Sequence, residues 1–232
     1  MIKKIIKTSL LQLAQKGHFL IARSNRVQEK IALRLLSRLF VPFNPSKFIW
    51  LGSTKNKGRY LVPPDILNCD MLISPGIGDS SEFEQAFWEK GKEVIMIDKV
   101  IRCRIPRLPN VKIIRSFVGP GPGLKWIDLN QIILKSAAKK VCLQMDIEGW
   151  EWPVMNSLSM KALDKIHYLV IELHGLSCLM IPGGYPQAYV NINSLLKKFK
   201  PLNWTPNFTN DGFFAGKKYF PDLVEICFKK KA

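Results

Sequence analysis

The chain has 232 residues, 47% of them hydrophobic, with 15 glycines and 15 prolines. This length and composition exclude a disordered protein and predict a globular one with a sizeable core. The 35 Lys and Arg residues exceed the 18 Asp and Glu residues, and the resulting net charge of +17 favours an anionic partner.

Basic residues are concentrated at the N-terminus. Residues 1–45 contain nine Lys and Arg residues and one acid, Glu29, so this segment contributes +8 to the net charge. We expect amphipathic helices over residues 2–15 and 25–40, because apolar residues recur there at spacings of three and four. Such helices either contact an anionic membrane surface or form an ordinary solvated face packed on the main domain.

The main domain is expected to span residues 46–232, because Pro42 and Pro45 break the helical pattern before it. Within it, short apolar strands alternate with helices. This alternation predicts an α/β fold with a mainly parallel sheet covered by helices on both faces. The predicted strands span residues 48–51, 71–74, 93–98, 111–117, 141–146, 167–173 and 223–229, and the predicted helices span 81–90, 127–138, 151–158 and 192–199.

Features of other protein classes are missing from the sequence. No run of apolar residues reaches the roughly 20 that a membrane span requires. Lys16, Gly17 and His18 interrupt the pattern of a signal peptide. The five cysteines are scattered without a Cys-x-x-Cys pair, as in a reduced intracellular protein. We therefore expect a cytoplasmic protein.

A glycine-containing turn follows the predicted strand at residues 71–74. Gly76 and Gly78 lie between this strand and a helix, where glycine lets the backbone turn sharply and approach a ligand. The next strand ends at Asp98, 20 residues past Gly78, where an acid typically accepts hydrogen bonds from ribose hydroxyls. Together these features predict a nucleoside cofactor at the carboxyl ends of the strands.

The residues after Gly78 discriminate between cofactors. A dinucleotide site has a third glycine beside the pyrophosphate, whereas this chain has Ser81 there, flanked by Asp79 and Glu82. Acids at a helix start repel a pyrophosphate but tolerate S-adenosylmethionine (SAM), which has no phosphate and carries a positive sulfonium. The pattern favours SAM over NAD, although the same acids also suit ordinary helix capping.

A second polar cluster follows the predicted strands at residues 141–146 and 167–173. Asp146 follows the first strand, and Glu172 and His174, two residues apart, point to the same side of the second. A histidine near a carboxylate can act as a general base on a hydroxyl, but the two residues also suit a structural pair at a strand end. Asp146 and Glu172 are in addition candidate ligands for Mg²⁺, without a diagnostic spacing.

Several motifs resemble those of the FkbM-type family of SAM-dependent methyltransferases. Residues 72–84 resemble the family segment Ser-(Pro/Phe)-Gly-(Val/Ile)-Gly-Asp, and residues 144–151 resemble Asp-Ile-Glu-Gly-x-Glu. Residues 171–174 match Ile-Glu-(Leu/Phe)-His, and residues 221–230 resemble the final strand of the family. The resemblance extends over about residues 48–230.

The resemblance implies a Rossmann-like class I methyltransferase fold, in which a seven-stranded, mostly parallel sheet has an antiparallel last strand. It also implies O-methylation, commonly of a hydroxyl on a sugar, a glycan or a secondary metabolite. The expected cofactor contacts are Gly76, Gly78, Asp79, Asp98, Phe117 and Asp146. The expected catalytic residues are His174, as the base, with Asp146 and Glu172, and the expected substrate contacts are Glu148, Trp150 and Asn207.

One departure from the family pattern concerns the acceptor pocket. Residues 205–208 read Thr-Pro-Asn-Phe, where related sequences often have His-Pro-Asn-Asn. The change is expected to alter the acceptor pocket or to remove activity.

The alternatives include a catalytically inactive module of methyltransferase fold that binds a membrane surface or a partner. They also include a nucleotide-dependent oxidoreductase, which Ser81 and the acidic helix start oppose. Nucleic acid is not expected as a substrate, because no Asn-Pro-Pro-Tyr-like motif is found at the relevant strand end. We expect a small-molecule or glycan acceptor, and peripheral membrane contact through the N-terminal helices.

Overall fold

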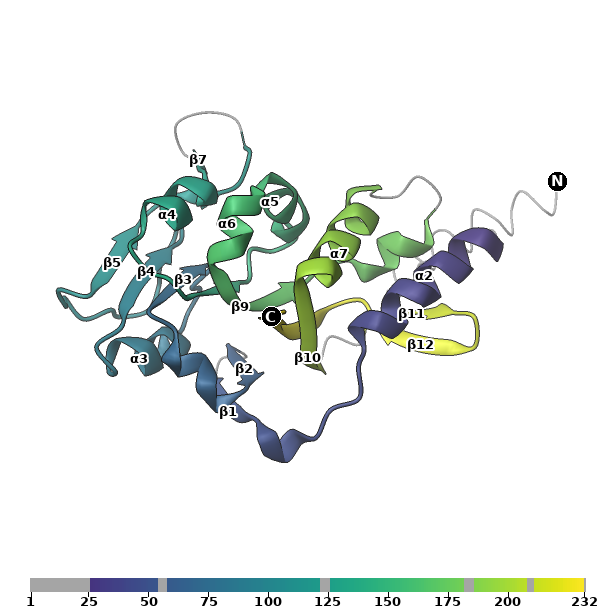
Figure 1. Cartoon of the computed structure of the whole chain (residues 1–232), viewed down its shortest axis with the longest axis horizontal. Coiled ribbons are helices and arrows are strands. Elements are labelled where there is room, and N and C mark those ends of the chain that lie inside the picture. The colour runs from purple at the N-terminus through teal and green to yellow at the C-terminus, as the bar shows by residue number, and fades with distance from the viewer. Residues whose placement is uncertain (1–25, 54–57, 122–125, 182–185, 208–210, 232) are drawn as a thin grey trace.

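A seven-stranded sheet forms the centre of the molecule in the computed structural model, which describes residues 26–53, 58–121, 126–181, 186–207 and 211–231 (Figure 1). The strand that ends the chain runs antiparallel to both of its neighbours, and all other pairs in the sheet are parallel. This arrangement confirms the predicted Rossmann-like α/β fold with an antiparallel last strand. In spatial order the strands are β10 (Phe199–Pro206), β13 (Val224–Lys230), β9 (Ile166–Leu173), β8 (Val141–Met145), β3 (Met71–Pro75), β4 (Glu93–Ile97) and β5 (Val111–Ile114).

The central strands are buried on both faces. Every residue of β3 and β8 is buried, as is nearly every residue of β9. Continuous apolar runs are typical of parallel strands that helices cover on both sides. The few polar side chains on these strands are therefore conspicuous, and they lie near the carboxyl ends.

Two layers cover the sheet (Figure 1). Successive side chains of a strand point to opposite faces, so Ile73 packs into one layer and Leu72 into the other. The first layer contains α2 (Arg26–Leu39), α4 (Leu129–Lys135), α5 (Glu151–Ser157), α6 (Met160–Lys165) and α7 (Pro186–Lys198). The second contains α3 (Glu82–Trp88), the hairpin of β1 (Ile49–Gly52) and β2 (Arg59–Val62), and the 3₁₀ helix η2 (Pro64–Asn68).

Some elements differ from the prediction. β10 was not predicted, because Pro201 and Pro206 obscure its strand pattern; prolines are tolerated here because β10 is an edge strand. The predicted strand at residues 48–51 is β1, which pairs only with β2 outside the central sheet.

Short elements near the sheet were also missed. They are β2, α6, the ladder of β6 (Phe117–Val118) and β7 (Trp126–Ile127), the hairpin of β11 (Gly212–Ala215) and β12 (Lys218–Pro221), and the 3₁₀ helices η1 (Pro45–Lys47), η2 and η3 (Leu176–Met180). Two to six residues are too few to display a helical or strand periodicity.

Helix α2 packs on the main domain through Ala32, Leu35, Leu36 and Leu39, all of which are buried. The predicted helix at residues 2–15 lies outside the described residues, and the division of the chain at residue 45 stays a prediction. Among the helices that are described, none combines the length and the apolar character needed to cross a bilayer.

Candidate active site

A cleft of about 330 Å³ opens where β3, β4, β8 and β9 end. Open α/β sheets bind ligands at this edge, outside the carboxyl ends of the strands. The lining brings together residues that are far apart in the sequence. It includes nine of the eleven predicted site residues: Gly76, Gly78, Asp79, Asp98, Asp146, Glu148, Glu172, His174 and Asn207.

Phe117 and Trp150 are not among the residues that line the cleft. Their rings pack on either side of Trp126, with centroid distances of 5.1 Å and 4.5 Å, and both side chains are about 40% exposed. Phe117 does not extend β5 as predicted, because it pairs with Trp126 in the separate β6–β7 ladder. The structure therefore places the predicted cofactor contact Phe117 and the predicted substrate contact Trp150 outside the cleft.

Different structural constraints favour glycine at positions 76 and 78, in the turn that follows β3. A Cβ atom on Gly76 would lie 1.6 Å from the carbonyl oxygen of Asp146, because the turns after β3 and β8 touch backbone to backbone. Gly78 has a φ of +59° and would meet no atom within 4 Å. Gly76 is thus required by the fold, whereas Gly78 leaves open space in which a ligand can approach the backbone.

Asp98 closes this turn from the end of β4. Its Oδ2 accepts hydrogen bonds from the backbone N–H groups of Ile77 at 2.9 Å and Gly78 at 3.2 Å. Its Oδ1 accepts one from the N–H of Val100 at 2.9 Å. The carboxylate lies on the cleft wall, where its remaining lone pairs can accept hydrogen bonds from ribose hydroxyls.

The segment after β8 is held in an unusual conformation. Glu148 has a φ of +55°, the only positive value of a described non-glycine residue, and Gly149 follows with +94°. The buried Glu151 carboxylate accepts hydrogen bonds from the N–H groups of Ile147 at 2.8 Å and Gly149 at 3.0 Å. These hydrogen bonds to Glu151 offset the backbone strain of the turn. They also keep Glu148, two residues after Asp146, on the lining of the cleft.

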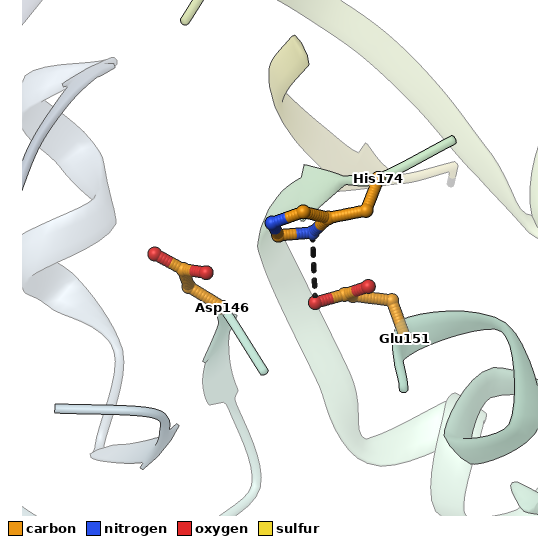
Figure 2. Close-up of side chains that lie close together, drawn as sticks. All are labelled: Asp146, Glu151 and His174. Atoms are coloured by element: carbon orange, nitrogen blue, oxygen red, sulfur yellow. Dashed lines mark ion pairs between the residues drawn. The ribbon is translucent and has the colours of Figure 1, made fainter. Parts of the chain in front are cut away.

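His174, at the end of β9, lies between carboxylates, and its ring extends toward Asp146 (Figure 2). Its Nδ1 atom is 3.2 Å from Glu151 Oε1, and its Nε2 atom is 3.6 Å from Glu148 Oε2. The Nδ1 contact is off the hydrogen-bond axis, so this buried nitrogen has no aligned partner. The indole N–H of Trp152 donates to the backbone oxygen of His174 at 2.8 Å and fixes the strand end, so Trp152 is a packing residue.

These contacts shift the protonation of the site. Burial lowers the pKa of His174, but the Glu151 carboxylate, followed by Glu172 and Asp146, outweighs burial and raises this pKa to about 9. Burial and then the neighbouring Glu172 carboxylate raise the pKa of Asp146 to about 9. At neutral pH, protons on His174 and Asp146 therefore offset part of the negative charge of the cleft.

A row of buried polar side chains runs beneath the cleft to Asp146. Ser74 Oγ lies 2.5 Å from both Glu84 Oε1 and Gln144 Oε1, yet a serine hydroxyl has only one hydrogen to donate. A protonated Glu84 that donates to Ser74 satisfies this geometry, and it agrees with the burial that raises the pKa of Glu84 to about 7. The amide of Gln144 donates to the Tyr60 hydroxyl at 3.0 Å, and that hydroxyl donates to Asp146 Oδ2 at 3.3 Å.

Asn207 and Glu172 form the opposite wall. The side-chain amide of Asn207 donates to Glu172 Oε1, and Thr205 Oγ1 donates to Glu225, which faces Glu172 across the β9–β13 ladder. Burial, and then the Glu172 carboxylate as the main charged neighbour, raise the pKa of Glu225 to about 8. The Thr-Pro-Asn segment therefore orients carboxylates at this wall.

The cleft is acidic although the chain as a whole is strongly basic. The lining residues that the structure describes include no Lys or Arg. Such a wall favours a ligand that carries positive charge and disfavours a pyrophosphate. The acids that line it are Asp79, Glu84, Asp98, Asp146, Glu148 and Glu172.

Of the two predicted Mg²⁺ ligands, Asp146 belongs to the group of possible metal ligands found among the described residues, and Glu172 does not. Candidate ligand atoms of Asp146, Glu151 and His174 do lie within 4.8 Å of one another. However, Mg²⁺ prefers six oxygens in an octahedron, and one donor here is an imidazole. Both Glu151 oxygens already accept backbone hydrogen bonds. We therefore assign no role to a metal ion.

The sequence analysis missed the supporting residues, chiefly Glu151, Glu84, Ser74, Gln144 and Tyr60. Glu151 lies in a motif that was identified, but its contacts with the turn and with His174 depend on the fold. Ser74 and Gln144 left a usable signal, because each is a polar residue near the end of an apolar, fully buried strand. Buried polar side chains are normally hydrogen-bonded, so such residues indicate a network.

Comparison with known proteins gives structural likenesses only. No protein-family model and no curated protein matches the chain. The similar solved structures include a Plasmodium falciparum protein provisionally described as a ribosomal RNA methyltransferase, with 12% identity, a TM-score of 0.39, and coverage of 90% of this chain and 97% of that one.

Two further similar structures are N-methyltransferases. NodS from Bradyrhizobium japonicum has 9% identity and a TM-score of 0.36, over 89% of this chain and 96% of that one. Coclaurine N-methyltransferase, bound to N-methylheliamine and SAH, has 10% identity and a TM-score of 0.37, over 99% of this chain and 94% of that one. We assign the fold from the strand order and the function from the cleft, and the FkbM-type resemblance stays a prediction.

We predict that Glu84→Gln removes a pH dependence of stability. The folded-state pKa of Glu84, about 7, is raised above the ordinary value of 4.5 that the unfolded chain has, so its stabilising contribution is complete below the unfolded value and is lost as pH rises through 7. The free energy of unfolding of the variant should therefore exceed that of wild type by roughly 2–3 kcal/mol at pH 8. At pH 5 the two free energies should agree within about 1 kcal/mol.

Urea denaturation at the two pH values measures this difference. Glu82→Gln, on the exposed side of the same helix, is the control and should show no such pH dependence. A Glu84→Gln protein that is less stable than wild type at pH 8 would contradict the raised pKa of Glu84.

We predict that Glu151→Gln lowers the pKa of His174. Removing the carboxylate leaves burial opposed only by more distant acids, so the pKa should fall from about 9 toward the ordinary histidine value of about 6.5. An NMR titration of the imidazole resonances measures it, with Glu148→Gln as a control because that side chain is 91% exposed. An unchanged His174 pKa in Glu151→Gln would contradict the assigned cause.

Proposed function

We propose that the protein is a SAM-dependent O-methyltransferase that methylates a hydroxyl of a sugar or glycan. The observation that carries the proposal is an acidic cleft beside an open glycine turn and Asp98, at the carboxyl ends of parallel strands. This combination suits a nucleoside that carries positive charge and no phosphate.

The residues present fit such a cofactor. Gly78 leaves space for a ligand against the turn, and Asp98 offers acceptors for ribose hydroxyls. A bound cation favours the ionised form of Asp146, so Asp146 and Glu148 would together supply negative charge for an amino group and a sulfonium. Bound SAM supplies an electrophilic methyl group on a positively charged sulfur.

His174 would act as the base. An acceptor hydroxyl must lose its proton as the new O–CH₃ bond forms, and His174 is the imidazole that lines the cleft. The raised pKa of His174 favours its protonated form at neutral pH. A cation held among the same carboxylates competes with that proton, so a bound sulfonium lowers the His174 pKa and makes the ring available as a base.

Other residues would position the base and the acceptor. Glu151 holds His174 through the Nδ1 contact at 3.2 Å, so Nε2 is the nitrogen that faces the cleft beside Glu148. Glu172, itself oriented by Asn207, offers an acceptor for a substrate hydroxyl. Carbohydrate as the acceptor class rests on the motif resemblance, with which this polar wall is compatible.

The acidic wall disfavours the nucleotide-dependent oxidoreductase, because a pyrophosphate would face carboxylates without a Lys or Arg among the described lining residues. The catalytically inactive module differs from the enzyme in a measurable way. A protein of that kind would bind a partner or a membrane without transferring a methyl group.

We predict that His174→Gln lowers methyl transfer from SAM to its sugar acceptor by roughly 10²- to 10⁴-fold in kcat, the usual contribution of a general base. SAM affinity should change little, because the imidazole is not expected to hold the cofactor. In wild type, kcat/KM should rise with pH as the imidazole loses its proton, and the variant should lose this rise.

The assay combines purified protein, methyl-labelled SAM and a panel of sugars and glycans, with products identified by mass spectrometry. His167→Gln is the matched control, because His167 lies at the other end of the same strand. Transfer to amines but not to hydroxyls would contradict O-methylation. SAM binding without transfer to any acceptor would favour the inactive module.

A further inference from the structure

A second surface lies outside the cleft, where α2 and the β11–β12 hairpin are side by side (Figure 1). The N–H of Gly216, at the turn of the hairpin, donates to Glu29 Oε1 on α2 at 2.7 Å. Leu33 of α2 approaches the same glycine. The two elements thus form one continuous face, which we call the docking face: the exposed residues of α2 together with residues 214–219.

The docking face exposes unusually large apolar side chains. In the hairpin, Phe213 and Phe220 point into the core, whereas Phe214 and Tyr219 are 63% and 52% exposed. These two outward residues are direct partners across the ladder, with ring centroids 5.4 Å apart. Val27 on α2 is 66% exposed. Among the described residues, Val27 and Phe214 are the two most exposed large hydrophobic side chains.

Positive charge surrounds these apolar side chains. The exposed basic residues are Arg26, Lys30, Arg34 and Arg38 on α2 and Lys217 and Lys218 at the hairpin turn. The single acid of α2, Glu29, is occupied by the hydrogen bond to Gly216. In the sequence, the preceding residues 1–25 contain five Lys and Arg residues and no acid. The docking face therefore combines a strong positive field with apolar groups that can leave water.

We propose that the docking face binds the surface of an anionic lipid bilayer. Lys and Arg are attracted to anionic headgroups, and aromatic and aliphatic side chains insert at the boundary with the acyl chains. Tyrosine is well suited to that boundary, because its ring is apolar and its hydroxyl stays hydrated. Charge alone would also suit a nucleic acid, but exposed Val27 and Ile31 gain nothing from phosphates and gain from burial in lipid.

The chain connects the docking face to the cleft. The hairpin is inserted between Asn207 and Leu223, and both of these residues line the cleft. Asp222, at the base of the hairpin, accepts a hydrogen bond from the N–H of Ser177 at 2.6 Å, in the segment that follows His174. Docking would thus bring the acceptor wall near the bilayer. If the proposed function holds, the acceptor is a hydroxyl carried by a membrane lipid, such as that of a lipid-linked sugar.

Sedimentation of the full chain with lipid vesicles tests the proposal. One vesicle set contains phosphatidylcholine alone, and the other contains phosphatidylcholine with phosphatidylserine. Binding should require phosphatidylserine and weaken with salt. Phe214→Ser with Tyr219→Ser should weaken it about tenfold or more, and Lys217→Gln with Lys218→Gln about thirtyfold. The control Leu134→Ser with Met160→Ser, which changes exposed apolar residues on α4 and α6, should leave binding unchanged.

Three results would overturn the proposal. The first is that the wild-type protein does not bind phosphatidylserine vesicles. The second is that both hairpin variants bind these vesicles as the wild type does. The third is that the protein binds RNA and not vesicles, and that the hairpin variants lose the RNA binding. A protein lacking residues 1–25 should keep hairpin-dependent binding, and complete loss there would assign the binding to that segment instead. The binding of SAM to each variant is measured separately by calorimetry without vesicles. A variant that binds SAM but not vesicles fails only in docking, whereas loss of SAM binding in all proteins is a failure of the proposed function.

Discussion

The backbone contact between the turns after β3 and β8 is the constraint on which the candidate site depends. Asp146 N–H donates to the Pro75 carbonyl at 3.1 Å, and the Asp146 carbonyl leaves no space for a Cβ atom on Gly76. The contact joins the cofactor turn to the start of the reaction site without an intervening side chain. Because both strands are buried on both faces, neither can shift to relax this contact.

Negative charge gathered at that junction explains the chemistry of the cleft. The neighbouring carboxylates outweigh burial and raise the pKa of His174, whereas burial and the Glu172 carboxylate raise the pKa of Asp146, so the site holds protons that a cationic ligand can replace. The exterior has the opposite sign, with a net charge of +17 over the whole chain. Under the two proposals, the acidic cleft would bind a cation and the basic docking face would bind an anionic surface.

The sequence predicted the parts of the molecule that have strong local patterns. Strands β3, β8 and β9 are apolar runs, and Gly76, Asp98 and His174 follow strand ends, so their place at one edge of the sheet follows from the topology of parallel strands. β10 was not predicted, because Pro201 and Pro206 interrupt the residue pattern that is typical of a strand. Phe117 was misplaced because it pairs with Trp126, a contact that no local pattern encodes.

The roles of Glu151 and Glu84 could not be predicted for a related reason. Each acts through contacts made only after folding, with residues on other elements. A carboxylate in a helix normally indicates a solvated face, yet both of these are buried and hydrogen-bonded to functional segments. Their burial depends on tertiary packing, which a single sequence shows only indirectly.

The most direct test of the central claim is a calorimetric comparison of SAM, S-adenosylhomocysteine and NAD⁺ as ligands of the purified protein. A cleft that selects a phosphate-free nucleoside should bind both adenosyl ligands in the micromolar range and fail to bind NAD⁺. Asp98→Asn should weaken the binding of both adenosyl ligands. Binding of NAD⁺ in preference to SAM, or no binding of SAM by the folded protein, would contradict the account of the cleft given above.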